Sequence, residues 1–229
     1  MRNRLSRSNL ICPFTLPTLQ DNRKSSVVQL VQATYWIETC PCRLQLNMKG
    51  MSRMEDQALK QFISSNYVVL DTTVTMLDGP TKNTFQQNLL DALEETQRHV
   101  WIPEEVYMEL KNGTKSSAKR EKAQSGIIFL NELGQNGMLD VYKQLTSERF
   151  ADAVFLTIFE MFRVKEQIGI ITQDIDLATS VFNSNLRQST SGKVVNVRYV
   201  NKQGQLSCYR TQIITGPNGS KAVRVFKGQ

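Results

Sequence analysis

Residues 67–77, "YVVLDTTVTML", run from a continuous apolar segment directly into the carboxylate of Asp71. A short continuous apolar run of this kind is typical of a strand that is buried on both faces of a parallel sheet. Residues 168–178, "IGIITQDIDLA", repeat the pattern later in the chain and lead to Asp174 and Asp176. Since ligands bind outside the carboxyl ends of parallel strands, we expect these acids to face one crevice.

The remaining patterns predict that strands and helices alternate along the chain. Helices are predicted over residues 54–65, 83–99, 103–112, 118–133, 147–167 and 176–185. Further short strands are predicted at 100–103 and 138–142. This alternation indicates an α/β fold in which helices cover a central parallel sheet. The helix over 147–167 is apolar nearly all round in its middle, so we expect it to be deeply buried.

The pattern changes after Gly192, where polar and apolar residues alternate with period two. Residues 193–200, 205–215 and 221–226 carry this alternation, and the turn sequences "NKQG" and "GPNGS" separate them. They predict either one strand at the edge of the sheet or a small antiparallel meander.

These patterns divide the 229 residues into three parts. Residues 1–53 lack sustained periodicity and are expected to be disordered or a non-native leader. Candidates for the natural start, in place of Met1, are Met48, Met51 and Met54. Residues 54–187, which carry the alternating strand and helix patterns, are expected to form one α/β domain, and residues 188–229 a basic, β-rich extension.

Charge is distributed unevenly around the net value of +7. Residues 1–53 contain eight Lys or Arg and two acids, and residues 188–229 contain seven Lys or Arg and no acid. The residues between them contain thirteen bases and nineteen acids. An acidic centre with basic flanks indicates that a polyanion is bound by the flanks and presented to the centre. A merely solvated basic surface is the alternative.

Two groups of basic residues are candidates for binding a phosphate backbone. The loop after Glu109 contains Lys111, Lys115, Lys119, Arg120 and Lys122, and we expect it to overhang one rim of the crevice. The extension contains Lys193, Arg198, Lys202, Arg210, Lys221, Arg224 and Lys227. Tyr199, Tyr209 and Phe226 are interleaved with them as candidate stacking surfaces. Single-stranded or looped RNA is the expected ligand.

Four acids are candidates for the chemistry of the crevice: Asp71, Glu109, Asp152 and Asp174. Carboxylates that lie close together need protons or cations to neutralise them. Oxygen ligands without Cys or His favour Mg²⁺ or Mn²⁺. The single histidine, His99, is expected at a helix end, which argues against a mechanism based on a Ser–His or Cys–His pair.

Each acid also has a structural interpretation that stays open. Asp71 could form a turn at a strand end, and Glu109 could be a solvated helix residue. Asp174 and Asp176 could cap a helix. Asp152 is harder to explain in this way, because it is flanked by apolar residues, among which an unpaired carboxylate is costly.

Four segments resemble, in order and spacing, the motifs of PIN-domain nucleases. They are "VVLDTTV", "IPEEVYMEL", "RFADAVFLTIF" and "GIITQDIDLA", and the resemblance covers residues 66–187. It implies a three-layer α/β sandwich with a central parallel sheet and a metal-dependent endoribonuclease. It also implies that Asp71, Asp152 and Asp174 bind the metal, with Glu109 as a further ligand or a water-orienting base.

The resemblance implies accessory roles and partners as well. Thr172 would bind metal-linked water or phosphate, and Asp176 would assist the site or cap the helix. The family usually has Asn two residues after its first Asp, whereas this chain has Thr73, which can still form hydrogen bonds. Besides RNA, an inhibitory antitoxin-like protein and a second copy of the chain are expected as partners.

Two other functions remain open. One is a catalytically idle PIN fold that binds nucleic acid. The other is a haloacid-dehalogenase-like phosphatase, although Thr73 stands where that class has its second Asp. No apolar stretch is long enough to cross a bilayer. The cysteines, which are expected to be free thiols in the cytoplasm, are Cys12, Cys40, Cys42 and Cys208.

Overall fold

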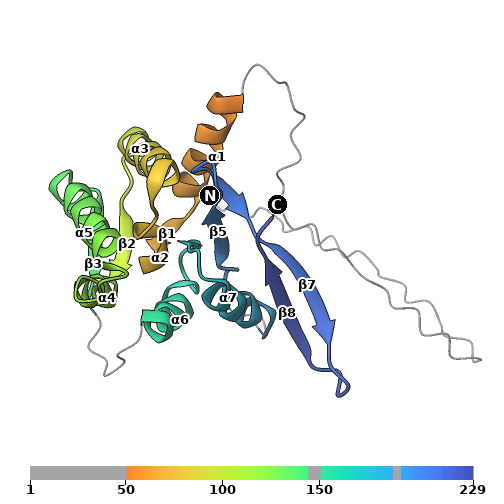
Figure 1. Cartoon of the computed structure of the whole chain (residues 1–229). Helices are drawn as coiled ribbons and strands as arrows, with labels where there is room; N and C mark the ends of the chain where they lie inside the picture. Colours follow the sequence, from red (N-terminus) through yellow and green to blue (C-terminus); the bar gives the residue numbers. More distant parts are fainter. Residues whose placement is uncertain (1–50, 144–150, 188–191, 229) are drawn as a thin grey trace, which may run out of the picture. The chain divides into compact units, whose positions relative to one another are not determined.

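The computed structural model describes residues 51–143, 151–187 and 192–228 (Figure 1). The expectations for residues 1–50, including Met48 as a start, lie outside these ranges. Within them, no helix has the length and apolar character that crossing a membrane requires.

A mostly parallel sheet of six strands lies at the centre of the fold, in the order β3-β2-β1-β4-β5-β6. The five parallel strands are β1 (Tyr67–Leu70), β2 (Val100–Pro103), β3 (Leu139–Tyr142), β4 (Ile168–Ile171) and β5 (Asn196–Val200). The short strand β6 (Leu206–Cys208) is antiparallel to β5. The prediction of a central parallel sheet is therefore confirmed.

Helices alternate with these strands and cover the sheet (Figure 1). They are α1 (Met51–Ser65), α2 (Thr72–Thr75), α3 (Gly79–Thr96), α4 (Glu104–Gly113), α5 (Arg120–Gln135), α6 (Ala151–Phe162) and α7 (Ile175–Arg187). This arrangement is an α/β fold and is consistent with a three-layer sandwich.

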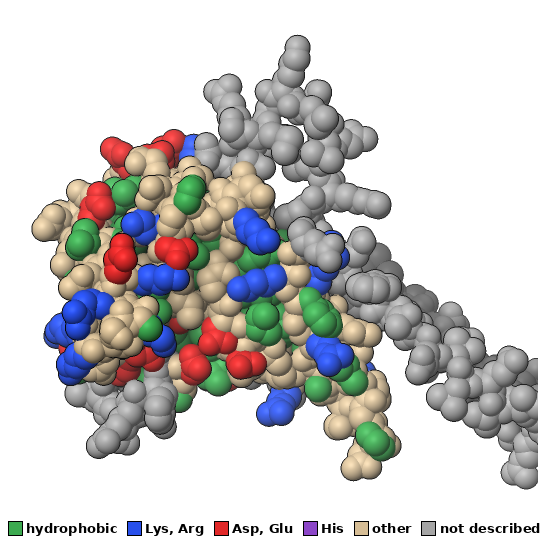
Figure 2. Space-filling model, viewed as in Figure 1, with side chains coloured by type: hydrophobic (Ala, Val, Ile, Leu, Met, Phe, Trp, Pro, Cys, Tyr) green, Lys and Arg blue, Asp and Glu red, His purple; other side chains and the backbone are tan. Residues whose placement is uncertain are grey.

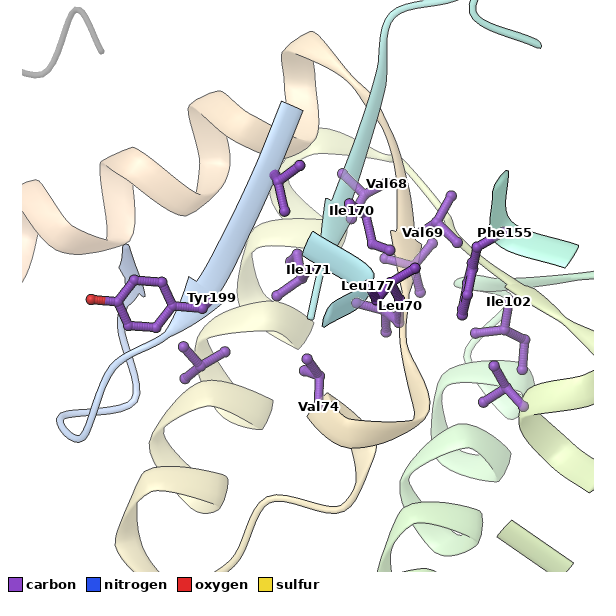
Figure 3. Close-up of a cluster of buried hydrophobic side chains, with 14 of the residues drawn as sticks. Val68, Val69, Leu70, Val74, Ile102, Phe155, Ile170, Ile171, Leu177 and Tyr199 are labelled. Carbon is purple, nitrogen blue, oxygen red and sulfur yellow. The ribbon is translucent and has the colours of Figure 1, made fainter. Parts of the chain in front are cut away.

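The apolar strand runs form the core because both faces of the sheet are covered. Val68, Leu70 and Ile170 are fully buried, and Figure 3 shows them packed among side chains from the surrounding helices, such as Phe155 of α6 and Leu177 of α7. β1 and β4 are neighbours, and Leu70 pairs with Ile171 at their carboxyl ends. The residues that follow these two strands therefore start from the same edge of the sheet.

The expectation that the helix around residues 147–167 is deeply buried is wrong for part of its surface. α6 buries Val154, Phe155 and Phe159, but Met161 is 57% exposed and Asp152 is also exposed. Apolar residues often remain on the surface of folded proteins, so an apolar sequence does not by itself bury every face of a helix. Asp152 consequently lies on an open face, not among the apolar residues that flank it in the sequence.

The C-terminal extension combines the two predicted arrangements. β5 and β6 extend the sheet, whereas β7 (Arg210–Thr215) and β8 (Lys221–Phe226) form a separate antiparallel pair. This pair packs against α7, where the backbone N–H of Val223 donates a 2.8 Å hydrogen bond to Oδ1 of Asn183.

Candidate active site

Asp71 lies at the carboxyl end of β1 and is only 4% exposed. Its backbone N–H donates a 3.1 Å hydrogen bond to the carbonyl oxygen of Ile171, which continues the pairing of β1 with β4. Its carboxylate makes no capping hydrogen bond to α2, the helix that follows it. Oδ2 instead accepts hydrogen bonds from the hydroxyls of Thr172, at 2.7 Å, and Thr73. The buried carboxylate is thus held by side chains of both strand ends.

Thr73 joins the same two strand ends. Besides donating to Asp71, its hydroxyl oxygen accepts a 2.9 Å hydrogen bond from the backbone N–H of Gln173. The hydroxyl of Thr172 likewise accepts a 2.9 Å hydrogen bond from the N–H of Asp174. These two threonines therefore fix the position of Asp71 relative to the loop that begins α7.

Asp174 caps the N-terminus of α7. Its Oδ1 accepts hydrogen bonds from the backbone N–H groups of Asp176, at 2.7 Å, and Leu177, at 3.2 Å. The capping interpretation is therefore confirmed for Asp174, while the Asp176 side chain is exposed. A negatively charged side chain at this position is favoured by the helix N-terminus.

Glu109 extends from α4, which follows β2, the other neighbour of β1. Its side chain is exposed, yet Oε2 accepts a 2.6 Å hydrogen bond from the hydroxyl of Thr72. Thr72 directly follows Asp71 in the sequence, so the residues after β1 include one of the acids and form a hydrogen bond to another. Thr72 was not among the candidate residues, although its hydroxyl beside the first acid was a usable signal in the sequence.

Asp152 lies in the first turn of α6 and interacts electrostatically with the other acids. Partial burial raises the pKa of its carboxyl, and the negative charges of Asp174, Glu109 and Asp176 raise it further. Asp152, one of the four acids expected at the crevice, thus interacts electrostatically with Asp174, Glu109 and Asp71.

The pKa of Asp71 is raised from 3.8 to about 6. Burial is the main cause, and the hydrogen bonds from Thr73 and Thr172 oppose it. The charges of Asp152 and Glu109 raise the pKa further. At neutral pH this group of carboxylates therefore carries unfavourable charge that a proton or a cation would relieve.

The donor set of this group suits Mg²⁺ or Mn²⁺ by its chemistry, since every candidate ligand is an oxygen. As they stand, however, no three His, Cys, Asp or Glu side chains in the described ranges form a group that could hold a metal ion. The four carboxylates are therefore coupled electrostatically but are not arranged as a finished ligand cage.

A cavity of about 510 Å³ lies between Glu109 and the basic loop. It is lined by Thr72, Met76, Glu109, Asn112, Gly113, Ser116 and Lys119. Lys119 thus lies on the rim near Glu109, as the position of the loop predicted. Lys122 does not line this cavity and instead forms a 2.5 Å ion pair with Asp78.

The extension contributes a residue whose position the sequence did not predict. The hydroxyl of Tyr209 donates a 2.9 Å hydrogen bond to the carbonyl oxygen of Thr172. Burial raises the pKa of this phenol, and the charges of Asp174 and Asp71 add to the effect. Tyr199 and Tyr209 are buried, so the interpretation of these two rings as stacking surfaces is wrong, whereas Phe226 is 41% exposed.

His99 lies away from this site, as expected. It is exposed between α3 and β2, and its Nδ1 is 3.2 Å from Oδ2 of Asp140. It therefore precedes β2, at the edge of the sheet opposite the acids.

No protein-family model matches the chain, and no curated protein matches it either. Function is therefore inferred from the residues of the site themselves. Glu109 and Asp152 belong to α4 and α6, whereas Asp71 and Asp174 lie between a strand and the helix that follows it. Each of the four acids interacts with at least one other member of the group.

Proposed function

We propose that this chain is a metal-dependent endoribonuclease with a PIN-like fold. The observation that supports the proposal is the buried carboxylate of Asp71 at the carboxyl edge of the sheet. Burial, with a smaller contribution from the charges of Asp152 and Glu109, raises its pKa to about 6. A buried carboxylate that neighbouring carboxylates repel, at such an edge, is typical of functional sites. The basic flanks of the chain favour RNA as the substrate.

The residues of the site have distinct roles in this proposal. Asp71, Asp152 and Asp174 hold the ion, which when bound lowers the pKa of water and offsets phosphate charge. Thr73 and Thr172 keep the Asp71 carboxylate in place. Thr72 fixes Oε2 of Glu109, so that Glu109 orients a water molecule through Oε1.

A PIN-like fold that binds RNA without cleaving it is the second candidate. It is favoured by the use of the Asp174 carboxylate as a helix cap and by Thr73 in place of the family's Asn. A dehalogenase-like phosphatase has less support, because Thr73 replaces the second Asp of that class and hydrogen-bonds to the first. An antitoxin-like inhibitor and a second copy of the chain remain predictions as partners.

Cleavage of fluorescent single-stranded and stem-loop RNA by the full chain tests the proposal. We expect cleavage with Mn²⁺ or Mg²⁺, loss of cleavage with EDTA, and loss of cleavage in Asp152→Asn. Because Asp152 is exposed, this variant should keep the wild-type unfolding curve and RNA affinity. Asp91→Asn, which changes an exposed acid on α3, is the matched control and should cleave like the wild type.

The possible results separate the candidates. An active Asp152→Asn protein would contradict the assignment of the metal site. A wild-type protein that binds RNA but does not cleave it under any metal condition would support the idle fold instead.

A further inference from the structure

The C-terminal extension is tied to the strand end that carries the acids. Tyr209, between β6 and β7, donates its hydroxyl hydrogen bond to the carbonyl oxygen of Thr172. The side-chain amide of Gln173 donates a 2.7 Å hydrogen bond to the carbonyl oxygen of Val200, at the end of β5. The extension therefore forms a wall next to the loop that begins α7.

Lys227 follows β8, and aromatic residues of this wall restrict the position of its side chain. Its Nζ lies 6.0 Å from the centroid of the Tyr199 ring, and that ring lies 4.9 Å from the ring of Tyr209. The hydroxyl of Tyr199 also donates a 3.3 Å hydrogen bond to the carbonyl oxygen of Gly228. A cation over an aromatic face, with its neighbouring backbone anchored, has a restricted position.

Lys227 also interacts with an acid of the site. The negative charge of Asp174 raises the pKa of its ammonium group, against a larger lowering by burial. The Asp174 carboxylate already accepts two backbone hydrogen bonds through Oδ1 as the cap of α7. Lys227 is exposed, so it has room for a ligand beside this carboxylate.

Basic residues therefore lie on both sides of the acids. β2 and β4 are the two neighbours of β1, so the Glu109 side and the Asp174 side flank Asp71. Lys119 lines the cavity on the Glu109 side, and Lys227 lies over the ring of Tyr199 in β5, the strand next to β4, which puts it on the Asp174 side. Figure 2 shows one face on which Asp and Glu side chains gather, with Lys and Arg side chains on either side of them. A phosphate backbone that crosses the acids needs such cations to offset repulsion.

We propose that Lys227 is a substrate-binding residue of the acidic site: its ammonium group binds an RNA phosphate beside Asp174, on the side opposite Lys119. The proposal rests on the nuclease function proposed above. It makes the extension part of the substrate groove, and it predicts an RNA strand that runs from the α4–α5 loop across the acids to the end of β8.

RNA binding without cleavage tests this proposal separately from catalysis. Fluorescence anisotropy of a short single-stranded RNA with the full chain, in EDTA and at rising KCl, compares the wild type with Lys227→Gln and Lys227→Arg. Loss of one phosphate contact should weaken binding several-fold and reduce the slope of log affinity against log salt by about 0.7. Lys227→Arg should bind like the wild type.

Lys165→Gln is the matched control, because Lys165 is an exposed lysine that precedes β4 at the opposite edge of the sheet. It should bind RNA with the wild-type affinity and salt slope. If Lys227→Gln also kept both values, the proposal would be overturned, and Lys227 would be only a structural neighbour of Asp174.

Steady-state cleavage kinetics with Mn²⁺ provide a second test of the role of Lys227. Lys227→Gln should raise KM more than it lowers kcat, because the lost contact is made in the ground state as well. A wild-type protein that does not cleave RNA would contradict the nuclease function, while the loss of affinity and salt slope in Lys227→Gln would still support the phosphate contact.

Discussion

The hydroxyl of Thr172 donates a 2.7 Å hydrogen bond to Oδ2 of Asp71, although 101 positions separate the two residues in the sequence. Both side chains are buried at the carboxyl ends of the paired strands β1 and β4. This contact joins the first and last of the four motifs directly. It also holds a carboxylate where burial and neighbouring charges oppose its ionisation.

The free energy of unfolding should fall as pH rises from about 4 to about 7 because of Asp71. Its pKa is raised from 3.8 to about 6, so the folded protein retains a proton that the unfolded chain has already lost. The resulting loss of stability is on the order of 3 kcal/mol at pH 7. Asp71→Asn should remove this fall, as measured by urea unfolding over a pH series.

The same experiment can include the metal. At pH 7, Mg²⁺ or Mn²⁺ should stabilise the wild type, because binding to the folded state alone raises stability, and it should not stabilise Asp71→Asn. Equal responses of the two proteins to the metal would contradict a role for Asp71 as a ligand.

Variants of Asp174 should separate its capping role from its charge. Asn can still accept the hydrogen bonds from Asp176 and Leu177, whereas Ala cannot, so Asp174→Ala should lose about 1 kcal/mol more stability than Asp174→Asn. Both variants should lose RNA cleavage. Thermal unfolding beside a cleavage assay measures the two effects, and an active Asp174→Asn protein would restrict Asp174 to capping.

Thr73→Val should destabilise the fold by about 1–3 kcal/mol, because Asp71 loses a donor and the N–H of Gln173 loses its acceptor. The loss of the donor should also raise the pKa of Asp71. Thr73→Ser keeps the hydroxyl and is the control. Urea unfolding of both variants measures the difference, and equal stability would show that the hydroxyl is not needed.

Thr72→Val should lower kcat by about tenfold to a hundredfold, because Glu109 loses the hydrogen bond that fixes Oε2. The affinity for RNA in EDTA should stay at the wild-type value. Thr72→Ser should restore kcat, and single-turnover cleavage assays compare the three proteins. An unchanged kcat in Thr72→Val would rule out the proposed role of Glu109.

Gly169→Ala should destabilise the fold by about 1–3 kcal/mol, because an added Cβ would lie 2.5 Å from Cζ of Phe62, where α1 packs on β4. Gly134→Ala in α5 is the control, since nothing lies within 4 Å of its added Cβ. A better helix former at that position should leave stability unchanged or raise it. Urea unfolding measures both variants, and equal stabilities would show that Phe62 can move aside.

Much of the fold could be predicted because the residues of a short segment indicate by themselves whether a strand is buried on both faces. The apolar runs before Asp71 and Asp174 are continuous, as in strands covered on both faces, and parallel strands direct their carboxyl ends to one edge. The oxygen-only character of the candidate ligands also followed from residue types alone. The four acids could therefore be identified from the sequence alone.

Only the tertiary structure decided how these residues meet. Which face of α6 is covered depends on what packs against it, so the exposure of Asp152 could not be predicted from its apolar neighbours. The hydrogen bond of Tyr209 to Thr172 and the electrostatic interaction of Lys227 with Asp174 depend on where the extension folds back. Local sequence determines the elements and their chemistry, whereas the distances between elements arise when their surfaces pack, and those distances set the charges that each carboxylate experiences.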